Sequence, residues 1–301
     1  ASNCALDSSI FLAASLAFFA SFAVKIPMWP FHTWLPLAHV EAPTAISVLL
    51  AGILLKLGVY GIIRVNYGIM PDQVYWFAGG LAFLGLVNVI WGGLCALAQT
   101  DLKKLVAYSS INHMGYSLIG IAAVVAAGEM NGGDLKAAQA GLSGAVFQMF
   151  NHGTISAMLF ILVGVVYERH HTRLIDKYGG LVQIMPKYAI VFMVFTLGAI
   201  GLPGTSGFVG EFLTVIAAFS ISKIVAFFAA TGVILSAVYG LFLYKNVVFG
   251  KITNETIELL NDLTVREKII LFPLAVLIIF FVKIKKAKQR PPLSTPSIRN
   301  Y

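Results

Sequence analysis

Long runs of apolar residues follow one another along the chain, separated by short polar connections. A helix needs roughly 20 apolar residues to cross the hydrocarbon layer of a membrane, and several runs reach that length. The runs are continuous rather than alternating, which favours membrane helices over barrel strands. We therefore expect an all-α polytopic membrane protein with about eight spans. The expected spans are 9–31, 43–64, 74–98, 102–127, 139–167, 186–219, 223–249 and 266–283.

Two of these spans contain segments that a continuous helix does not tolerate. The first has Pro27 and Pro30, and the sixth has a Gly-Leu-Pro-Gly sequence that begins at Gly201. Proline lacks the backbone donor and clashes with the preceding turn, so we expect both helices to be broken. An ionisable residue lies beside each break, Lys25 in the first span and Glu211 in the sixth.

The two broken spans occupy corresponding places in an inverted repeat. Each is followed by a span that contains Val-Tyr-Gly, at 59–61 and at 238–240. Five steps separate the first span from the sixth, so the two would cross the membrane in opposite directions. We expect residues 1–64 to be the end of a first five-helix repeat, 65–250 a complete second repeat, and 251–301 a final helix with a basic tail. Because the chain starts with Ala1 and the earlier spans of the first repeat are absent, we expect a processed part of something larger.

The composition agrees with a membrane protein and limits the possible partners. The chain is 58% hydrophobic and 11% charged, whereas soluble domains are about a quarter charged. The formal net charge of +8 is spread over short connections and the tail, which argues against a nucleic-acid partner. Basic residues that follow the odd-numbered spans predict the cytoplasmic or matrix side. They are Lys103, Lys104, Arg169, Arg173, Lys177, Lys187, Lys245, Lys251, Arg266 and Lys268.

The two cysteines carry no sign of a cofactor. Cys4 and Cys95 form no Cys-x-x-Cys or Cys/His spacing, which argues against iron–sulfur clusters, haem attachment and structural zinc. We expect both to be small apolar side chains and expect no cofactor in this chain.

Ionisable residues inside the spans are the candidates for chemistry, because burying a charge in lipid is costly. Lysine can store a proton, since burial lowers its pKa and a nearby carboxylate raises it, and histidine titrates near neutrality. Glu211 follows a helix break, where the positive end of the resumed helix favours a carboxylate. His32 could extend such a relay. The candidates are Lys25, Lys56, His113, His152, Glu211 and His32.

Each candidate also has a structural interpretation. Lys25 could extend to a membrane surface, Glu211 could only cap a helix, and a lone histidine is often a hydrogen-bonded core residue. We expect a structural role for His39 and Glu41, a solvated loop for His170 and His171, and a capped, charged helix start for Asp101, Lys103 and Lys104.

Several ordered motifs between about residues 20 and 250 resemble the antiporter-like subunit 4 family of respiratory complex I. They are Val-Lys-Ile-Pro-Met-Trp-Pro (24–30), Ala-His-Val-Glu-Ala-Pro-Thr (38–44), Leu-Leu-Lys-Leu-Gly (54–58), Gln-Thr-Asp-Leu-Lys-Lys-Leu (99–105), Asn-His-Met-Gly (112–115), Asn-His-Gly (151–153) and Gly-Phe-Val-Gly-Glu-Phe (207–212). The sister subunits generally have lysine where Glu211 stands, so the resemblance favours subunit 4.

The resemblance implies roles for the candidates. Lys25 would be the central lysine of a first half-channel, Lys56 the link between halves, and Glu211 the distal group, with His113 and His152 on the polar axis between them. The family pairs the equivalent of Lys25 with a glutamate on an earlier helix. We therefore expect a separate chain with the missing spans to supply it, or else that the first half has been lost.

The resemblance also implies the surroundings of the chain. The partners would be other membrane-arm subunits of complex I and lipids, and NADH, FMN, iron–sulfur clusters and ubiquinone would lie in partner subunits. We expect a proton-translocating, non-redox subunit of NADH:ubiquinone oxidoreductase. A subunit of a multi-subunit cation/proton antiporter and a structural scaffold are the alternatives. We expect the mitochondrial inner membrane, with the bacterial plasma membrane as the alternative.

Overall fold

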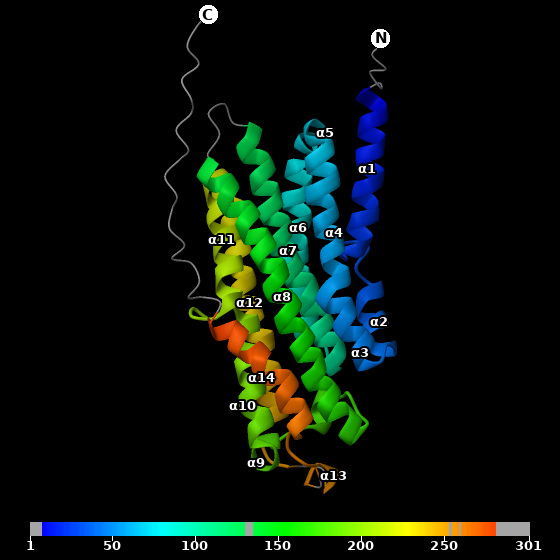
Figure 1. Ribbon diagram of the computed structural model, residues 1–301, viewed down its shortest axis with the longest axis vertical. Helices are drawn as coiled ribbons and strands as arrows, with labels where there is room; N and C mark the ends of the chain where they lie inside the picture. The colour runs from blue at the N-terminus through cyan, green and yellow to red at the C-terminus, as the bar shows by residue number, and fades with distance from the viewer. Residues whose placement is uncertain (1–7, 130–134, 253–254, 259, 281–301) are drawn as a thin grey trace, which may run out of the picture.

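A computed structural model describes residues 8–129, 135–252, 255–258 and 260–280, and this part of the chain is a bundle of helices (Figure 1). Among these residues the sole β-type pairing is an isolated bridge between Asp101 and Leu174. The helices are α1 (Ser8–Lys25), α2 (Trp34–Glu41), α3 (Thr44–Leu49), η1 (Leu50–Leu54), α4 (Leu55–Gly61), η2 (Ile62–Tyr67), α5 (Pro71–Trp76), α6 (Ala78–Leu97), α7 (Leu102–Glu129), α8 (Leu135–His170), η3 (Ile175–Lys177), α9 (Leu181–Ile184), α10 (Pro186–Ile200), α11 (Ser206–Ile221), α12 (Lys223–Val248), α13 (Glu255–Glu258) and α14 (Val265–Phe280).

The all-α membrane architecture predicted from the apolar runs is confirmed. Five helices in the described part are long and apolar enough to cross a membrane: Thr44–Tyr67, Ala78–Leu97, Leu102–Ala127, Lys136–His170 and Lys223–Val248. The two predicted broken spans correspond to shorter apolar helices, namely α1 and the pair α10 and α11. The last predicted span begins as α14, and its end at 281–283 and the basic tail lie outside the described residues.

Some boundaries differ from the prediction for local reasons. The second predicted span is one continuous helix, but it contains two π-helical segments, η1 and η2, on either side of α4. The third predicted span begins with a separate short helix, α5, because the chain departs from helical geometry at Phe77 (φ −110°, ψ 18°). Apolar length alone does not reveal either feature, because no proline marks the π-helical segments and Phe77 lies among apolar residues.

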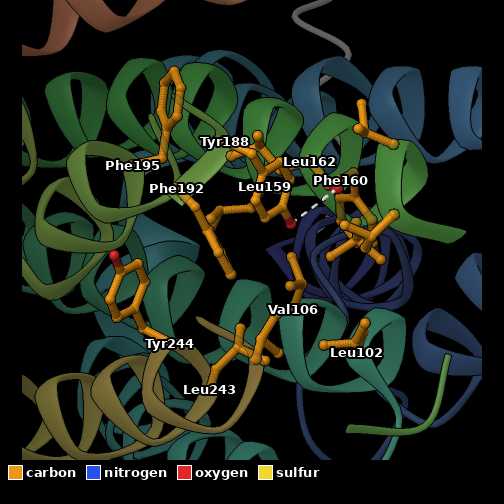
Figure 2. Packing of buried hydrophobic residues seen from close by; sticks show 14 of the residues in the cluster. Leu102, Val106, Leu159, Phe160, Leu162, Tyr188, Phe192, Phe195, Leu243 and Tyr244 are labelled. Atoms are coloured by element: carbon orange, nitrogen blue, oxygen red, sulfur yellow. Dashed lines mark hydrogen bonds between the residues drawn. The ribbon is translucent and has the colours of Figure 1, made fainter. Parts of the chain in front are cut away.

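Helix α7 is the centre of the bundle. In an 18-residue stretch of α7, 94% of the residues are buried, compared with 33% in α12. α7 packs chiefly against α6, α8 and α11. Toward one end of the bundle, side chains from α7, α8, α10 and α12 form an apolar core in which Tyr188 donates a hydrogen bond of 3.2 Å to the carbonyl of Leu162 (Figure 2).

Both predicted helix breaks occur, and polar contacts to neighbouring helices hold them. At the first break α1 ends at Lys25, and the side chain of Asn88 on α6 accepts from the amide of Trp29 (2.9 Å) and donates to the carbonyl of Pro27 (3.3 Å). At the second break Asn151 of α8 donates to the carbonyl of Ser206 (2.5 Å). Figure 1 shows α1 and the pair α10 and α11 running in opposite directions, as the inverted repeat predicts.

Candidate functional site

Four of the candidate residues form a row across four helices. Lys56 of α4 reaches His152 of α8, with 2.7 Å between Nζ and Nδ1. The ring of His152 lies 5.7 Å, centroid to centroid, from the ring of His113 on α7. Nδ1 of His113 lies 2.9 Å from Oε1 of Glu211 on α11. The helix positions were expected from the sequence, but the mutual distances are a result of the fold.

The Lys56 end of the row depends on close helix contact and on a π-helical turn. Lys56 follows η1, and its ammonium group also donates to the carbonyl of Ala51 in that turn. Gly52 and Gly153 face each other, and a Cβ on Gly153 would lie 3.0 Å from the carbonyl oxygen of Gly52. The small residues let α8 approach the Lys56 segment closely, and this brings His152 within reach of the ammonium group.

The Glu211 end is a buried pair held by two further side chains. The side chains of His113 and Glu211 are 7% and 4% exposed. Gln148 Nε2 donates to Oε1 of Glu211 (3.3 Å), and the hydroxyl of Tyr239 lies 3.2 Å from Nε2 of His113. Both nitrogens of His113 therefore have polar partners, and the ring orientation is fixed whichever nitrogen carries the proton.

A small cavity of about 10 Å³ lies between His152, His113 and Glu211. This volume is close to what one water molecule needs. Four residues on its wall have a buried polar atom without a hydrogen-bond partner in the described part of the chain: His152 Nε2, Gln148 Oε1, Asn151 Oδ1 and Glu211 Oε2. Unpaired buried polar atoms are unusual in folded proteins and call for an explanation.

Glycines at the second break let the backbone approach Glu211. Gly201 has a left-handed φ of 74°, and a Cβ there would lie 2.8 Å from Oε2 of Glu211. A Cβ on Gly207 would lie 2.0 Å from the carbonyl oxygen of Gly198, so the end of α10 touches the start of α11 at this point. The break therefore sets the position of the carboxylate relative to α10.

Lys25 and His32 are not part of the row. Lys25 is the last residue of α1, and its side chain is exposed, but its Cβ packs beside Gly58, two residues after Lys56. His32 is buried, with its ring 6.4 Å from the ring of Tyr108, and its Nδ1 has no partner among the described residues.

The other polar residues singled out in the sequence have mixed outcomes. Asp101 accepts from the amides of Lys103 (2.8 Å) and Lys104 (3.1 Å), which confirms the capped helix start. Within this helix start Lys103 is buried and donates to the carbonyl of Ala42 (2.9 Å). It thereby links the start of α7 to the corner between α2 and α3.

The histidines outside the row do not form a metal site. His39 is fully buried and stacks on Phe160, with 4.2 Å between ring centroids, as a structural residue would. His170 lies at the end of α8 with its ring 5.0 Å from that of Tyr178, so it belongs to packed structure rather than to the expected loop. Within the described residues no group of three His, Cys, Asp or Glu side chains has the geometry for a metal ion.

Sequence reasoning missed three residues of the site, Gln148, Asn151 and Tyr239. A signal was present for two of them, because Gln148, Asn151 and His152 follow at i, i+3 and i+4 in an apolar helix and so lie on one face. Tyr239 belongs to the second Val-Tyr-Gly motif, which was interpreted only as a mark of the repeat. Its counterpart Tyr60 is 56% exposed, whereas Tyr239 is 3% exposed.

Comparisons with known proteins agree with this architecture. The sequence model of the membrane family described as NADH:quinone oxidoreductase/Mrp antiporter matches residues 2–238. The chain is 53% identical over 259 residues to NADH-quinone oxidoreductase subunit M of Rhodobacter capsulatus, which covers 86% of this chain and 48% of that protein. It is 44% identical over 273 residues to NADH-ubiquinone oxidoreductase chain 4 of Chondrus crispus, which covers 91% of this chain and 52% of that protein.

A solved structure extends the likeness to the fold. A chain of respiratory complex I from Thermus thermophilus with bound NADH superposes with a TM-score of 0.78 at 31% identity, over 90% of this chain and 54% of that chain. The present chain thus spans about half the length of the relatives it matches. From the matched family model, the relatives and the shared fold, the chain belongs to the NADH:quinone oxidoreductase/Mrp antiporter membrane family.

Proposed function

We propose that this chain conducts protons along the row Lys56, His152, His113 and Glu211, as a membrane subunit of an NADH:quinone oxidoreductase with no redox centre of its own. The observation that carries the proposal is the continuous row from the ammonium group to the carboxylate across four helices, with a close polar contact at each end and two neighbouring imidazole rings between them. Ionisable groups inside a membrane are expensive, and a row of them marks an ion or proton path.

The first transfer in the proposed path joins Lys56 to His152. The ammonium group of Lys56 donates along the 2.7 Å contact to Nδ1 of a neutral His152. When the proton moves, Lys56 becomes a neutral amine and His152 an imidazolium that carries a second N–H at Nε2. Histidine suits this step because its two nitrogens let a proton arrive at one side of the ring and leave from the other.

The second transfer crosses the small cavity. Nε2 of His152 and Oε2 of Glu211 are both unpaired in the described part of the chain, and both residues line the cavity. A water molecule in this space would link the two atoms and deliver the proton to the carboxylate. Gln148 and Nδ1 of His113 both bond to Oε1 of Glu211, which leaves Oε2 as the receiving atom. His113 then takes part in the row by sharing the arriving proton with the carboxylate along the 2.9 Å contact.

Lys25 and His32 would extend the path on the other side of Lys56. The packing of the Lys25 Cβ beside Gly58 supports this place for Lys25, because Gly58 follows Lys56 by two residues. His32 lies buried on the connection between α1 and α2. NADH, FMN, iron–sulfur clusters and ubiquinone would lie in partner subunits, and quinone reduction there would drive the charge movements in this chain.

The sequence identities favour this function over a cation/proton antiporter. The matched family includes Mrp antiporters, but the relatives named as NADH-quinone or NADH-ubiquinone oxidoreductase subunits are 44 to 53% identical to this chain. A structural scaffold is the other alternative, and the buried row of titratable groups speaks against it. The chain is a multi-pass membrane protein; the mitochondrial inner membrane is our proposal for its location, and the bacterial plasma membrane is the alternative.

The decisive experiment replaces Glu211, which the row requires as an ionisable group. In the assembled complex reconstituted in vesicles, Glu211→Gln keeps the shape but cannot hold a proton, and we expect the ratio of protons pumped to NADH oxidised to fall. The exposed Glu258 on α13 provides the control, and Glu258→Gln is expected to pump normally. Unaltered pumping in an assembled Glu211→Gln complex would show that the carboxylate is structural.

A further inference from the structure

An open groove of about 500 Å³ lies between the outer face of α14 and the adjacent face of α10. Its walls are apolar, and Val191 of α10 and Leu271, Phe272 and Ala275 of α14 contribute to them. Phe272 is 70% exposed and Ile269, also on the wall, is 67% exposed. Helix α14 packs on α8, α10 and α11, and the groove is part of the surface of α14 that the described chain leaves uncovered.

A lysine lies at the same end of each groove wall. Lys268 belongs to the groove lining and precedes Phe272 by four residues, so both lie on one face of α14. Lys187 precedes Val191 by four residues on α10, and its side chain is exposed. The same helix buries Tyr188, Phe192 and Phe195 in the core (Figure 2), whereas Val191 is only partly buried and Lys187 is exposed.

Neighbouring acids do not neutralise these two lysines. Glu267 forms two hydrogen bonds of 2.8 Å with Arg169 of α8. The carboxylate of Asp262 accepts from the amides of Lys187 and Tyr188, both at 3.1 Å, and so caps α10. Within the described residues neither Lys187 nor Lys268 has an ion pair.

These contacts also fix the groove in place. Arg169 donates to the carbonyl of Asn261 (2.9 Å) as well as to Glu267, which ties the start of α14 to α8. The cap from Asp262 ties the preceding loop to the start of α10. Hydrogen bonds therefore hold the starts of both groove walls in place. The two lysines lie at this end of the groove, and apolar side chains line the rest of it. Both lysines lie on the side predicted to be cytoplasmic or matrix.

We propose that this groove binds an anionic phospholipid, with one acyl chain along α10 and α14 and the phosphate between Lys187 and Lys268. Basic pockets between membrane helices on this side of the bilayer suit anionic headgroups. The charge at one end distinguishes such a ligand from a zwitterionic lipid, and the apolar walls distinguish it from free phosphate. The proposal is independent of the proton path, because the groove shares no lining residue with the cavity beside Glu211.

Photo-crosslinking in the intact, membrane-embedded complex tests the site. The probes are phosphatidylglycerol and phosphatidylcholine that carry the same diazirine on one acyl chain, and mass spectrometry of digests locates the labelled peptides. We expect phosphatidylglycerol to label peptides from α10 and α14 in preference to phosphatidylcholine. A surface lysine adds about fivefold to the affinity for anionic lipid, so each of Lys187→Gln and Lys268→Gln should lower the preference by about that factor.

Two further variants separate the site from general effects of charge and packing. Lys245→Gln combined with Lys251→Gln removes two positive charges predicted on the same side but away from the groove, and should leave the labelling unchanged. Ala275→Trp fills the groove and should reduce labelling by both probes. The proposal fails if both lipids label the groove equally, if the label lies outside α10 and α14, or if a partner subunit is crosslinked there instead.

Discussion

The ammonium nitrogen of Lys56 lies 2.7 Å from Nδ1 of His152, although 96 residues separate the two in sequence. The contact joins the helix that follows the first break to the long helix α8, which is predicted from the sequence to belong to the second repeat. In the proposed path it is the point at which a proton passes from α4 to α8.

The first prediction concerns this contact. Lys56→Ala removes the proton donor and His152→Ala removes the acceptor, so each is expected to lower NADH-driven proton uptake by about tenfold or more. Because both act in one transfer, the double variant should lose little beyond either single variant. Proton uptake by the reconstituted complex, per NADH oxidised, measures the effect.

The control for this prediction is Lys223→Ala, which removes an exposed lysine at the start of α12. It should assemble and pump as the wild type does. If the losses of the two single variants simply add in the double variant, Lys56 and His152 act independently and the proposed transfer between them is wrong.

The second prediction assigns a positioning role to Tyr239. Tyr239→Phe removes the hydroxyl that lies 3.2 Å from Nε2 of His113, which leaves a buried nitrogen unpaired at a cost of about 1–3 kcal/mol. We expect the pH profile of proton pumping to shift, because the hydroxyl no longer bonds to a titratable side chain of the row. The profile is measured as initial pumping rate against pH in vesicles.

Tyr244→Phe is the matched control for Tyr239→Phe. Tyr244 lies on the same helix and donates to the carbonyl of Ala189 (3.1 Å), away from the row. It should cost similar stability and leave the profile in place. Identical profiles for the two variants would mean that Tyr239 only packs.

The sequence predicted more of the helices than of their mutual contacts. Pro27 and Pro203 indicate breaks because proline cannot continue a helix, and the apolar runs set the number of spans. The roles of Gln148 and Tyr239 depend on how helices rotate against one another, which depends on packing across the whole bundle. The π-helical turn η1 before Lys56 has no proline to mark it, although it decides which carbonyl the ammonium group reaches.

The third prediction concerns the contact between the halves of the second broken span. Gly207→Ala would place a Cβ 2.0 Å from the carbonyl oxygen of Gly198, so the start of α11 must move away from α10. Overpacking of this kind costs about 1–3 kcal/mol or more. We expect less assembled complex and, in what assembles, weaker pumping, because Glu211 lies one turn further along α11.

Gly79→Ala serves as the reference for Gly207→Ala. Gly79 lies in α6 with no atom within 4 Å of an added Cβ, and alanine is the better helix former. Assembly, measured on native gels, should be equal to or better than that of the wild type. Normal assembly and pumping in Gly207→Ala would show that α10 and α11 can move apart at the break without loss of function.

The fourth prediction is an acidic residue near Lys25 that the described part of the chain does not supply. Lys25 ends α1 with an exposed side chain, and no acidic side chain of the described residues forms an ion pair with it. An ammonium group at membrane depth needs a carboxylate nearby, both to offset the loss of hydration and to let its protonation change. We therefore predict a glutamate or aspartate from another polypeptide segment within about 4–6 Å of Lys25 in the assembled complex.

A structure of the whole assembly tests this prediction directly, and a charge exchange tests it functionally. Once the carboxylate is identified, Lys25→Glu should abolish pumping, and replacing that acid with lysine in the same complex should restore part of it, because the pair regains opposite charges. Asn88→Ala tests whether the pairing of Lys25 depends on the turn that follows it. The side chain of Asn88 bonds to the amide of Trp29 and to the carbonyl of Pro27 in this turn. If lipid or an apolar surface faces Lys25 instead, its ammonium group extends to the membrane surface and the proposed path begins at Lys56.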